Sequence, residues 1–80
     1  MTRAEILARI GRVLTAVLER PDVVVTEKTT AADIEEWDSL NHIQIVVAIE
    51  KDLKVKFTSA EIQGWKNVGD VCDAACRRLG

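Results

Sequence analysis

The chain has 80 residues, of which 48% are apolar and 30% are charged, and this composition excludes disorder and predicts one folded domain over residues 1–80. So small a domain leaves little room for a deep enzyme cleft, and its formal net charge of −2 disfavours nucleic-acid binding, which needs a basic face. No apolar run is long enough to cross a membrane, and the first residues lack an apolar signal-peptide core, so we expect a cytoplasmic protein.

The first predicted helix covers residues 3–19. Thr2 followed by Glu5 is a capping box, which marks the start of a helix. Pro21 ends the helix, because proline disfavours helical backbone at the residue before it. The apolar residues between these signals recur at helical spacing: Ile6, Leu7, Ile10, Val13, Leu14, Val17 and Leu18.

Residues 20–37 are predicted to form a long ordered loop. Residues 23–25 and 55–57 resemble strands, but two such short segments make only a marginal sheet. We therefore expect the three valines of the loop, together with Ile34, to pack on the helices. The middle of the chain is acidic, since residues 22–50 hold seven acidic residues and one lysine.

A second helix is predicted over residues 39–53, with Asp38 as its N-cap. Its apolar residues fall on two sides. One side has the spacing of a core face: Ile45, Val46, Ile49 and Leu53. The other side, flanked by Gln44 and Glu50, consists of Leu40, Ile43 and Val47. A helix with two apolar sides either lies at the centre of the core or presents one side to a partner.

Two further helices complete the prediction. Thr58 and Glu61 form a capping box for a short helix that Gly64 ends. Asn67 caps a last helix over residues 68–79. The apolar stripe of that last helix consists of Val68, Val71, Cys72, Ala75 and Leu79. The predicted fold is therefore an all-α four-helix bundle, with three longer helices, one short helix and a long loop between the first two.

Residues 36–40, Glu-Trp-Asp-Ser-Leu, resemble the attachment site of acyl carrier proteins. In that family an Asp-Ser-Leu tripeptide opens the second helix, and its serine carries 4′-phosphopantetheine. The resemblance therefore implies that Ser39 is the attachment residue, with Asp38 beside it. Residues 37–43 look especially like small, free-standing carriers. The likeness extends over nearly the whole chain and includes the first helix, the long loop, the apolar helix over 43–53, Phe57-Thr58 and residues 67–71.

The family's activity implies that the chain is not an enzyme. Such a carrier holds an acyl or aminoacyl group as a thioester on its arm and presents it to partner enzymes in fatty acid or secondary metabolite biosynthesis. The implied partners are a phosphopantetheinyl transferase that uses coenzyme A, a ligase or synthase that loads the arm, and a transferase or condensing enzyme that unloads it. A monomer suits this shuttle role.

The resemblance also assigns surfaces. The partner-binding residues are expected to be Leu40, Ile43, Val47, Glu50 and Glu36, and an acyl pocket is expected at Trp65 and Ile49. A tryptophan at that position could fill the pocket and favour short, polar or aromatic cargo. Glu36 stands where many members have glycine, and three positions that are often acidic in the fatty-acid type are not acidic here: Asn41, Gln44 and Lys51. We interpret the chain as a specialised carrier whose docking depends more on apolar contact than on charge.

Two other functions are compatible with the residues. The first is a helical bundle that binds one partner and has no prosthetic group. The second is a small serine hydrolase built from Ser39, His42 and Asp38, although Asp38 is better used as a cap. His42 is expected at the surface near the arm. It is the only histidine of the chain, and together with two cysteines it gives too few ligands for a closed zinc site, which needs four. The two cysteines, Cys72 and Cys76, are expected to be small buried hydrophobic residues.

Overall fold

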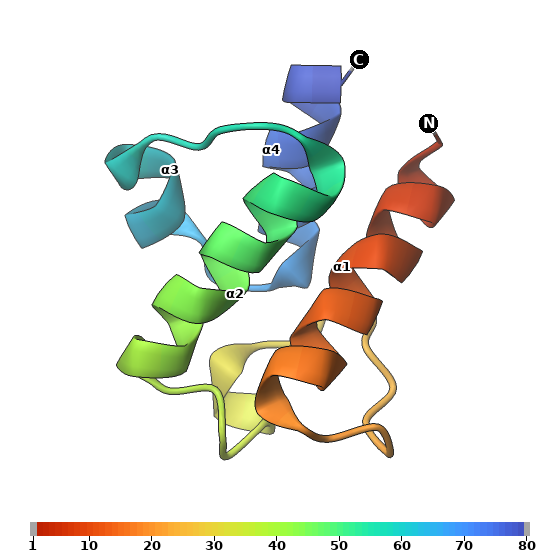
Figure 1. The fold of residues 1–80 in the computed structure, drawn as a ribbon, viewed down its shortest axis with the longest axis vertical. Coiled ribbons are helices and arrows are strands. Elements are labelled where there is room, and N and C mark those ends of the chain that lie inside the picture. Colours follow the sequence, from red (N-terminus) through yellow and green to blue (C-terminus); the bar gives the residue numbers. More distant parts are fainter. Residues whose placement is uncertain (1, 80) are drawn as a thin grey trace.

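The computed structural model describes residues 2–79. Within that range the chain forms four α-helices and one 3-10 turn: α1 (Arg3–Leu18), η1 (Ala31–Asp33), α2 (Ser39–Leu53), α3 (Ser59–Gly64) and α4 (Val68–Leu79). Figure 1 shows α1 and α2 side by side, with the loop between them crossing the end of the bundle where α1 finishes and α2 begins. The described residues contain no β-strand, so the all-α prediction and its division into three longer helices and one short one are confirmed.

Local side-chain caps explain where the helices begin. At the start of α1 the Thr2 hydroxyl accepts a hydrogen bond from the Glu5 backbone N–H, and the Glu5 carboxylate accepts one from the Thr2 N–H. Thr58 and Glu61 form the same reciprocal pair at the start of α3. Each pair satisfies backbone donors that have no partner inside the helix. Both predicted capping boxes are therefore confirmed.

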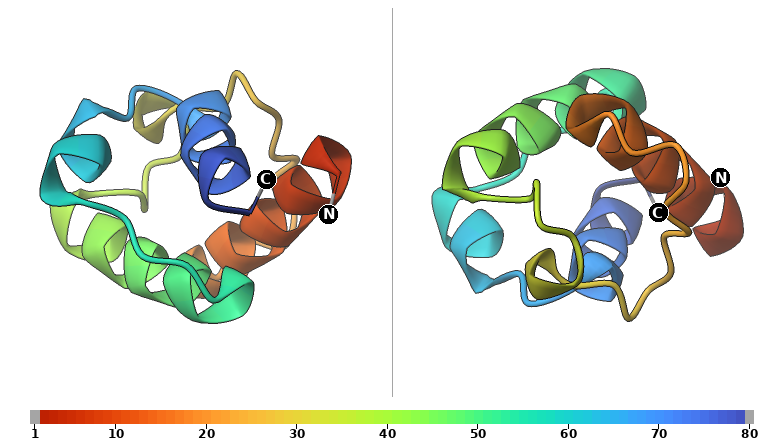
Figure 2. Two further views of the ribbon diagram at one scale, coloured as in Figure 1. Left: turned by 90° about the horizontal axis from the view of Figure 1, so that it is seen from above. Right: turned by 90° about the horizontal axis from the view of Figure 1, so that it is seen from below.

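The core forms where α1 packs against α2 and α4; the two views in Figure 2 show these three helices arranged around a common interior. The buried residues of α1 are four apart, as expected for one helix face. Two expectations about packing were wrong. Val24 is 82% exposed and Leu79 is 37% exposed, because Val24 points away from the helices in the loop and Leu79 ends α4 beyond the last turn that packs. The fully buried large side chains are Ile6, Ile10, Leu14, Ile45, Ile49, Val68 and Cys72.

The loop over residues 19–38 is ordered by its own contacts. Ile34 and Trp37 are buried in the core, and Val23 and Val25 are half-buried against it. The sequence did not predict η1 inside this loop. There the Asp33 carboxylate accepts a hydrogen bond from the Thr30 backbone N–H at 2.9 Å, which stabilises the turn in the manner of a helix cap. Residue 29, just before η1, is hydrogen-bonded to the start of α4, and η1 then leads the chain towards α2.

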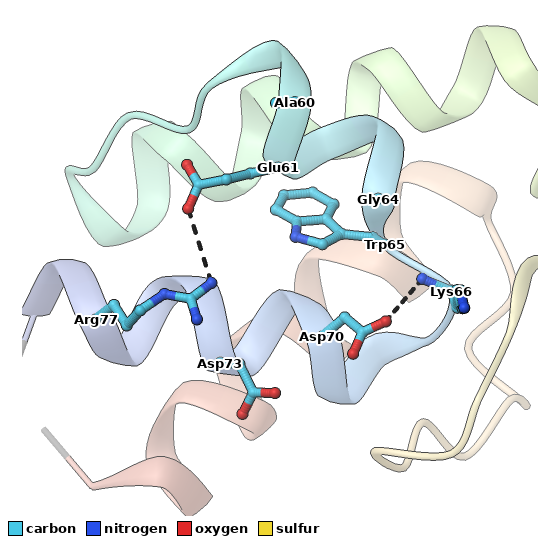
Figure 3. Close-up of a pocket in the computed structure, with 8 residues that line it drawn as sticks. All are labelled: Ala60, Glu61, Gly64, Trp65, Lys66, Asp70, Asp73 and Arg77. Atoms are coloured by element: carbon cyan, nitrogen blue, oxygen red, sulfur yellow. Dashed lines mark hydrogen bonds and ion pairs between the residues drawn. The ribbon is translucent and has the colours of Figure 1, made fainter.

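The short helix α3 is tied to α4 mainly by charge (Figure 3). The Glu61 carboxylate lies 3.9 Å from Arg77 and also pairs with Arg78. At the junction between the two helices, Asp70 accepts a hydrogen bond from the Lys66 backbone N–H at 2.8 Å. The chain therefore enters α4 in a fixed direction, although α3 has only six residues.

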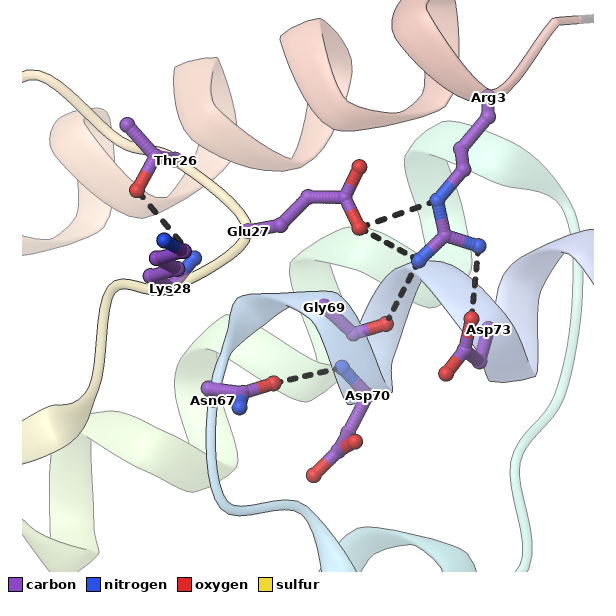
Figure 4. Close-up of polar contacts among 8 residues, drawn as sticks. All are labelled: Arg3, Thr26, Glu27, Lys28, Asn67, Gly69, Asp70 and Asp73. Carbon is purple, nitrogen blue, oxygen red and sulfur yellow. Dashed lines mark hydrogen bonds and ion pairs between the residues drawn. The ribbon is translucent and has the colours of Figure 1, made fainter.

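Arg3 joins three segments that are distant in sequence (Figure 4). Its guanidinium lies 2.6 Å from Glu27 in the loop and 2.7 Å from Asp73 in α4. The same loop accepts two backbone hydrogen bonds from the start of α4: the Val68 N–H donates to the Thr29 carbonyl at 2.9 Å, and the Gly69 N–H donates to the Glu27 carbonyl at 2.8 Å. A Cβ at position 69 would lie 3.0 Å from that carbonyl oxygen, so glycine permits this close approach.

We expect the Arg3 contacts to make stability depend on acid pH. The hydrogen bond from Arg3 lowers the pKa of Glu27 below its ordinary value of 4.5. A carboxylate whose pKa is lowered by folding stabilises the fold above its unfolded-state pKa and loses that effect as the pH falls through the folded-state value. Arg3→Ala should therefore lower the melting temperature at neutral pH and partly flatten its decrease below about pH 4.5.

Arg12→Ala is the matched control for this measurement. It removes the same charge from an exposed position of α1 that forms no ion pair with residues 2–79. The flattening should be partial, because Glu5, Asp22 and Glu61 also have lowered pKa values through their own hydrogen bonds. Equal pH profiles for the two variants would contradict the role given to Arg3.

Candidate functional site

Ser39 is the first residue of α2, and its side chain is exposed. The Asp38 carboxylate caps the helix by accepting a hydrogen bond from the Asn41 backbone N–H at 2.9 Å, which confirms Asp38 as the N-cap. The backbone N–H groups of Ser39 and Leu40 find no acceptor among residues 2–79. They add to the partial positive charge of a helix N-terminus. An exposed hydroxyl thus lies beside two free backbone donors.

The backbone in front of Ser39 is held in a defined turn. The Asn41 side-chain amide donates to the Glu36 carbonyl at 2.7 Å, and the Trp37 N–H donates to the Ile34 carbonyl at 3.1 Å. The Glu36 carboxylate pairs with Arg20 at 2.7 Å. Glutamate at position 36 is therefore accommodated by an ion pair with Arg20, which follows the end of α1.

Trp37 and His42 are joined by a hydrogen bond that the sequence did not predict. The Trp37 indole Nε1–H donates to His42 Nδ1 at 3.1 Å, with the two rings stacked at a centroid distance of 6.1 Å. Trp37 is buried, with 8% of its surface exposed, but His42 is half-buried rather than on the open surface. Together with Ala31, Asp38 and Ser39, the two rings line a hollow of about 410 Å³.

This hydrogen bond disfavours the hydrolase hypothesis. A serine nucleophile needs a histidine nitrogen with a free lone pair to accept its proton. A neutral imidazole has one such nitrogen, and in His42 that nitrogen accepts the Trp37 indole proton. The Asp38 carboxylate is used as a helix cap. Neither residue is arranged to activate Ser39.

The two apolar sides of α2 separate as the spacing predicts. The core side is buried, whereas Leu40 is 67% exposed, Ile43 63% and Val47 43%. The Glu50 carboxylate accepts a hydrogen bond from the Phe57 backbone N–H at 2.9 Å, so it holds the loop that follows α2. Lysines surround the far end of the exposed stripe, in a hollow of about 360 Å³ that is lined by Val47, Glu50, Lys51, Lys54, Val55 and Lys56.

Trp65 and Ile49, which the sequence assigned to an acyl pocket, have different environments. Ile49 is 1% exposed and belongs to the core. Trp65 is half-buried, and its ring lies nearly perpendicular to the rings of Phe57 and His42, at centroid distances of 5.0 and 6.2 Å. Its outer surface borders a hollow of about 430 Å³ among charged residues of α3 and α4 (Figure 3). Trp65 therefore packs against the edge of the hydrophobic core that contains Ile49.

The cysteines show no feature of a reactive site. Cys72 is fully buried, and burial raises the pKa of its thiol to about 11, which keeps it protonated and unreactive. Cys76 is half-buried. No group of three or more possible metal-ligating side chains occurs among residues 2–79. In that range, no helix is long and apolar enough to span a bilayer.

The comparisons with known proteins decide between the remaining alternatives. The family model described as "Phosphopantetheine attachment site" matches residues 4–75. The chain belongs to the acyl carrier protein family. Its relatives include the acyl carrier proteins of Saccharopolyspora erythraea, 30% identical over 91% of this chain and 77% of that protein, and of Thermosynechococcus vestitus, 31% identical over 91% and 90%. The solution NMR structure of the holo acyl carrier protein from Geobacter metallireducens superposes with a TM-score of 0.85, at 37% identity over 91% of this chain and 84% of that one.

An acyl carrier protein uses 4′-phosphopantetheine as its prosthetic group, and the residues at the start of α2 suit such a group. A phosphodiester needs an oxygen for attachment and donors for its negative charge. Ser39 offers an exposed hydroxyl, and the free N–H groups of Ser39 and Leu40 lie next to it. The interaction bundle without a prosthetic group is therefore not favoured. As a carrier, the protein interacts with the enzymes that load and use its arm.

Proposed function

We propose that Ser39 is the residue that carries 4′-phosphopantetheine and that residues 1–80 form a single carrier domain without catalytic activity. The exposure of its hydroxyl at the first position of α2, beside two free backbone donors, carries this proposal. When bound, the arm supplies a terminal thiol that holds the cargo as a thioester. The protein's own contribution is to tether that thiol and raise its local concentration at each partner enzyme.

Loading followed by fragment mapping tests the proposal. The full chain is incubated with coenzyme A and a broad-specificity phosphopantetheinyl transferase, and its intact mass is measured. We expect an increase by one phosphopantetheine, located by fragmentation on the peptide that contains Ser39. An unchanged mass, or an arm on a peptide without Ser39, would overturn the proposal.

The partner-binding surface is proposed to be the exposed stripe of Leu40, Ile43 and Val47, with Glu36 and Glu50 at its borders. The three apolar residues are exposed although they are large, which is typical of an interaction surface. The two glutamates have partners of their own, Arg20 and the Phe57 N–H, so their charges are partly offset. We expect a monomer, because self-association through this stripe would hide it from partner enzymes.

We also propose that Trp65 limits the cargo to short, polar or aromatic groups. The support is its packing against Phe57 and His42, over the interior that contains Ile49. Carriers loaded with a short and with a long acyl chain should give similar amide chemical shifts in the core. Large shifts at Trp65 and Ile49 that occur only with the long chain would refute this limit.

The cellular location is proposed to be the cytoplasm. Both cysteines are free thiols, and free thiols are typical of reducing compartments.

A further inference from the structure

The His42 ring is bonded at one nitrogen and available at the other. An indole N–H can only donate, so the nitrogen that faces Trp37 Nε1 at 3.1 Å must carry a lone pair. That nitrogen is Nδ1, and the proton of the neutral ring is therefore on Nε2. The contact with the buried Trp37 thus selects one tautomer of His42 and orients its ring.

His42 Nε2 is accessible from outside the protein. His42 Nε2 has no hydrogen-bond partner among residues 2–79. Every buried side-chain nitrogen or oxygen in this range does have a partner, so Nε2 is not a buried atom. Since His42 is half-buried, its unpaired Nε2 must reach the surface. His42 lines the same hollow as Ser39 and lies three residues further along α2, which places both side chains on one face of the helix.

A hydrogen-bond donor at His42 Nε2 would stabilise a negative charge placed at this hollow. A phosphodiester on Ser39 would be an anion close to the Asp38 carboxylate. Asp38 is engaged with the Asn41 N–H, and Glu36 is paired with Arg20. The free N–H groups of Ser39 and Leu40 are donors at the start of α2. The His42 side chain lines the same hollow as Ser39, and its unpaired Nε2–H is the further donor that it can offer there.

We propose that His42 is a positioning residue for the prosthetic arm. Its Nε2–H donates a hydrogen bond to a phosphodiester oxygen on Ser39, and Trp37 holds the ring in the tautomer that makes this donation possible. This inference rests on the proposed attachment at Ser39.

Nuclear magnetic resonance of the loaded chain tests the inference, after its intact mass and fragment map have shown one arm on Ser39. In the wild type, we expect the ¹⁵N resonance of His42 Nε2 to shift between the unloaded and loaded forms, while Nδ1 stays close to its unloaded position. Failure of the arm to attach would count against the proposed function. An attached arm with no shift at Nε2 would overturn only the role of His42.

Two substitutions distinguish a hydrogen bond from residue 42 to the phosphodiester from a purely structural role of His42 beside Trp37. The Asn side chain in His42→Asn can still accept the Trp37 indole proton but does not reach the Nε2 position, whereas the longer amide in His42→Gln can place a donor there. In the loaded chain, the ³¹P resonance should shift in His42→Asn and stay near its wild-type position in His42→Gln. Identical ³¹P resonances in all three proteins would overturn the proposal. The wild-type comparison decides alone if either variant fails to fold.

Trp37→Phe tests the tautomer. It keeps an aromatic ring but removes the indole proton that occupies Nδ1. The ring ¹⁵N resonances of His42 should move from the values of a pure Nε2–H tautomer towards those of a mixture. Unchanged ring resonances in this variant would contradict the tautomer-setting role of Trp37.

Discussion

Ser39→Ala is expected to take up no phosphopantetheine at all, whereas Ser59→Ala should be loaded as completely as the wild type. The chain contains only these two serines, and they are closely matched. Each is exposed and is the first residue of a helix, after Asp38 at α2 and after Thr58 at α3. The Ser39 variant lacks the oxygen to which the arm would be joined, so the expected loss is complete rather than partial.

The two serine variants also show whether the transferase recognises the surroundings of Ser39 or only an exposed serine at the start of a helix. Exposure and a helix start are common to both serines, but only Ser39 borders the hollow with Trp37 and His42, next to the exposed stripe of α2. Intact mass after exhaustive loading is the measurement. The melting temperatures of both variants should stay close to that of the wild type, because an exposed Ser→Ala change alters stability by about 0.5 kcal/mol or less. Residual loading of Ser39→Ala would show that another hydroxyl is used.

Helix boundaries could be predicted because short-range signals determine them. Thr2, Asp38, Thr58 and Asn67 each precede a helix as expected, and each side chain accepts a hydrogen bond from a backbone N–H three residues later. The two sides of α2 followed from spacing alone, since helical geometry fixes which residues share a face. The predicted exposure of Leu40, Ile43 and Val47 was correct for that reason.

Contacts between distant segments could not be predicted in this way. Arg3 meets Glu27 and Asp73 through the folded bundle, and nothing in the local sequence joins them. Trp37 and His42 are only five residues apart, but a loop and a helix start separate them, so no periodicity indicated their hydrogen bond. The turn η1 is different, because the Thr30-Ala-Ala-Asp33 pattern is itself a capping signal and could have revealed it.

Ile43→Gln is expected to lower the efficiency of arm transfer by a phosphopantetheinyl transferase about tenfold, which corresponds to about 1.4 kcal/mol of lost binding in the transition state. Ile43 is 63% exposed at the centre of the proposed docking stripe. Its side chain would be buried by a partner that approaches Ser39, and glutamine removes that apolar contact while preserving helix propensity. The expected change is a higher KM with little change in kcat, measured by steady-state loading rates.

Val24→Gln is the matched control. Val24 is a large apolar side chain that is strongly exposed, like Ile43, but it lies in the loop and not on α2. Its loading rate should equal that of the wild type. Loading by the wild type should also weaken only slightly between about 0.05 and 0.5 M salt, because Glu36 pairs with Arg20, Glu50 holds the Phe57 N–H and lysines surround the far end of the stripe. A steep loss of efficiency with salt, together with normal loading of Ile43→Gln, would show that charge rather than this apolar stripe directs docking.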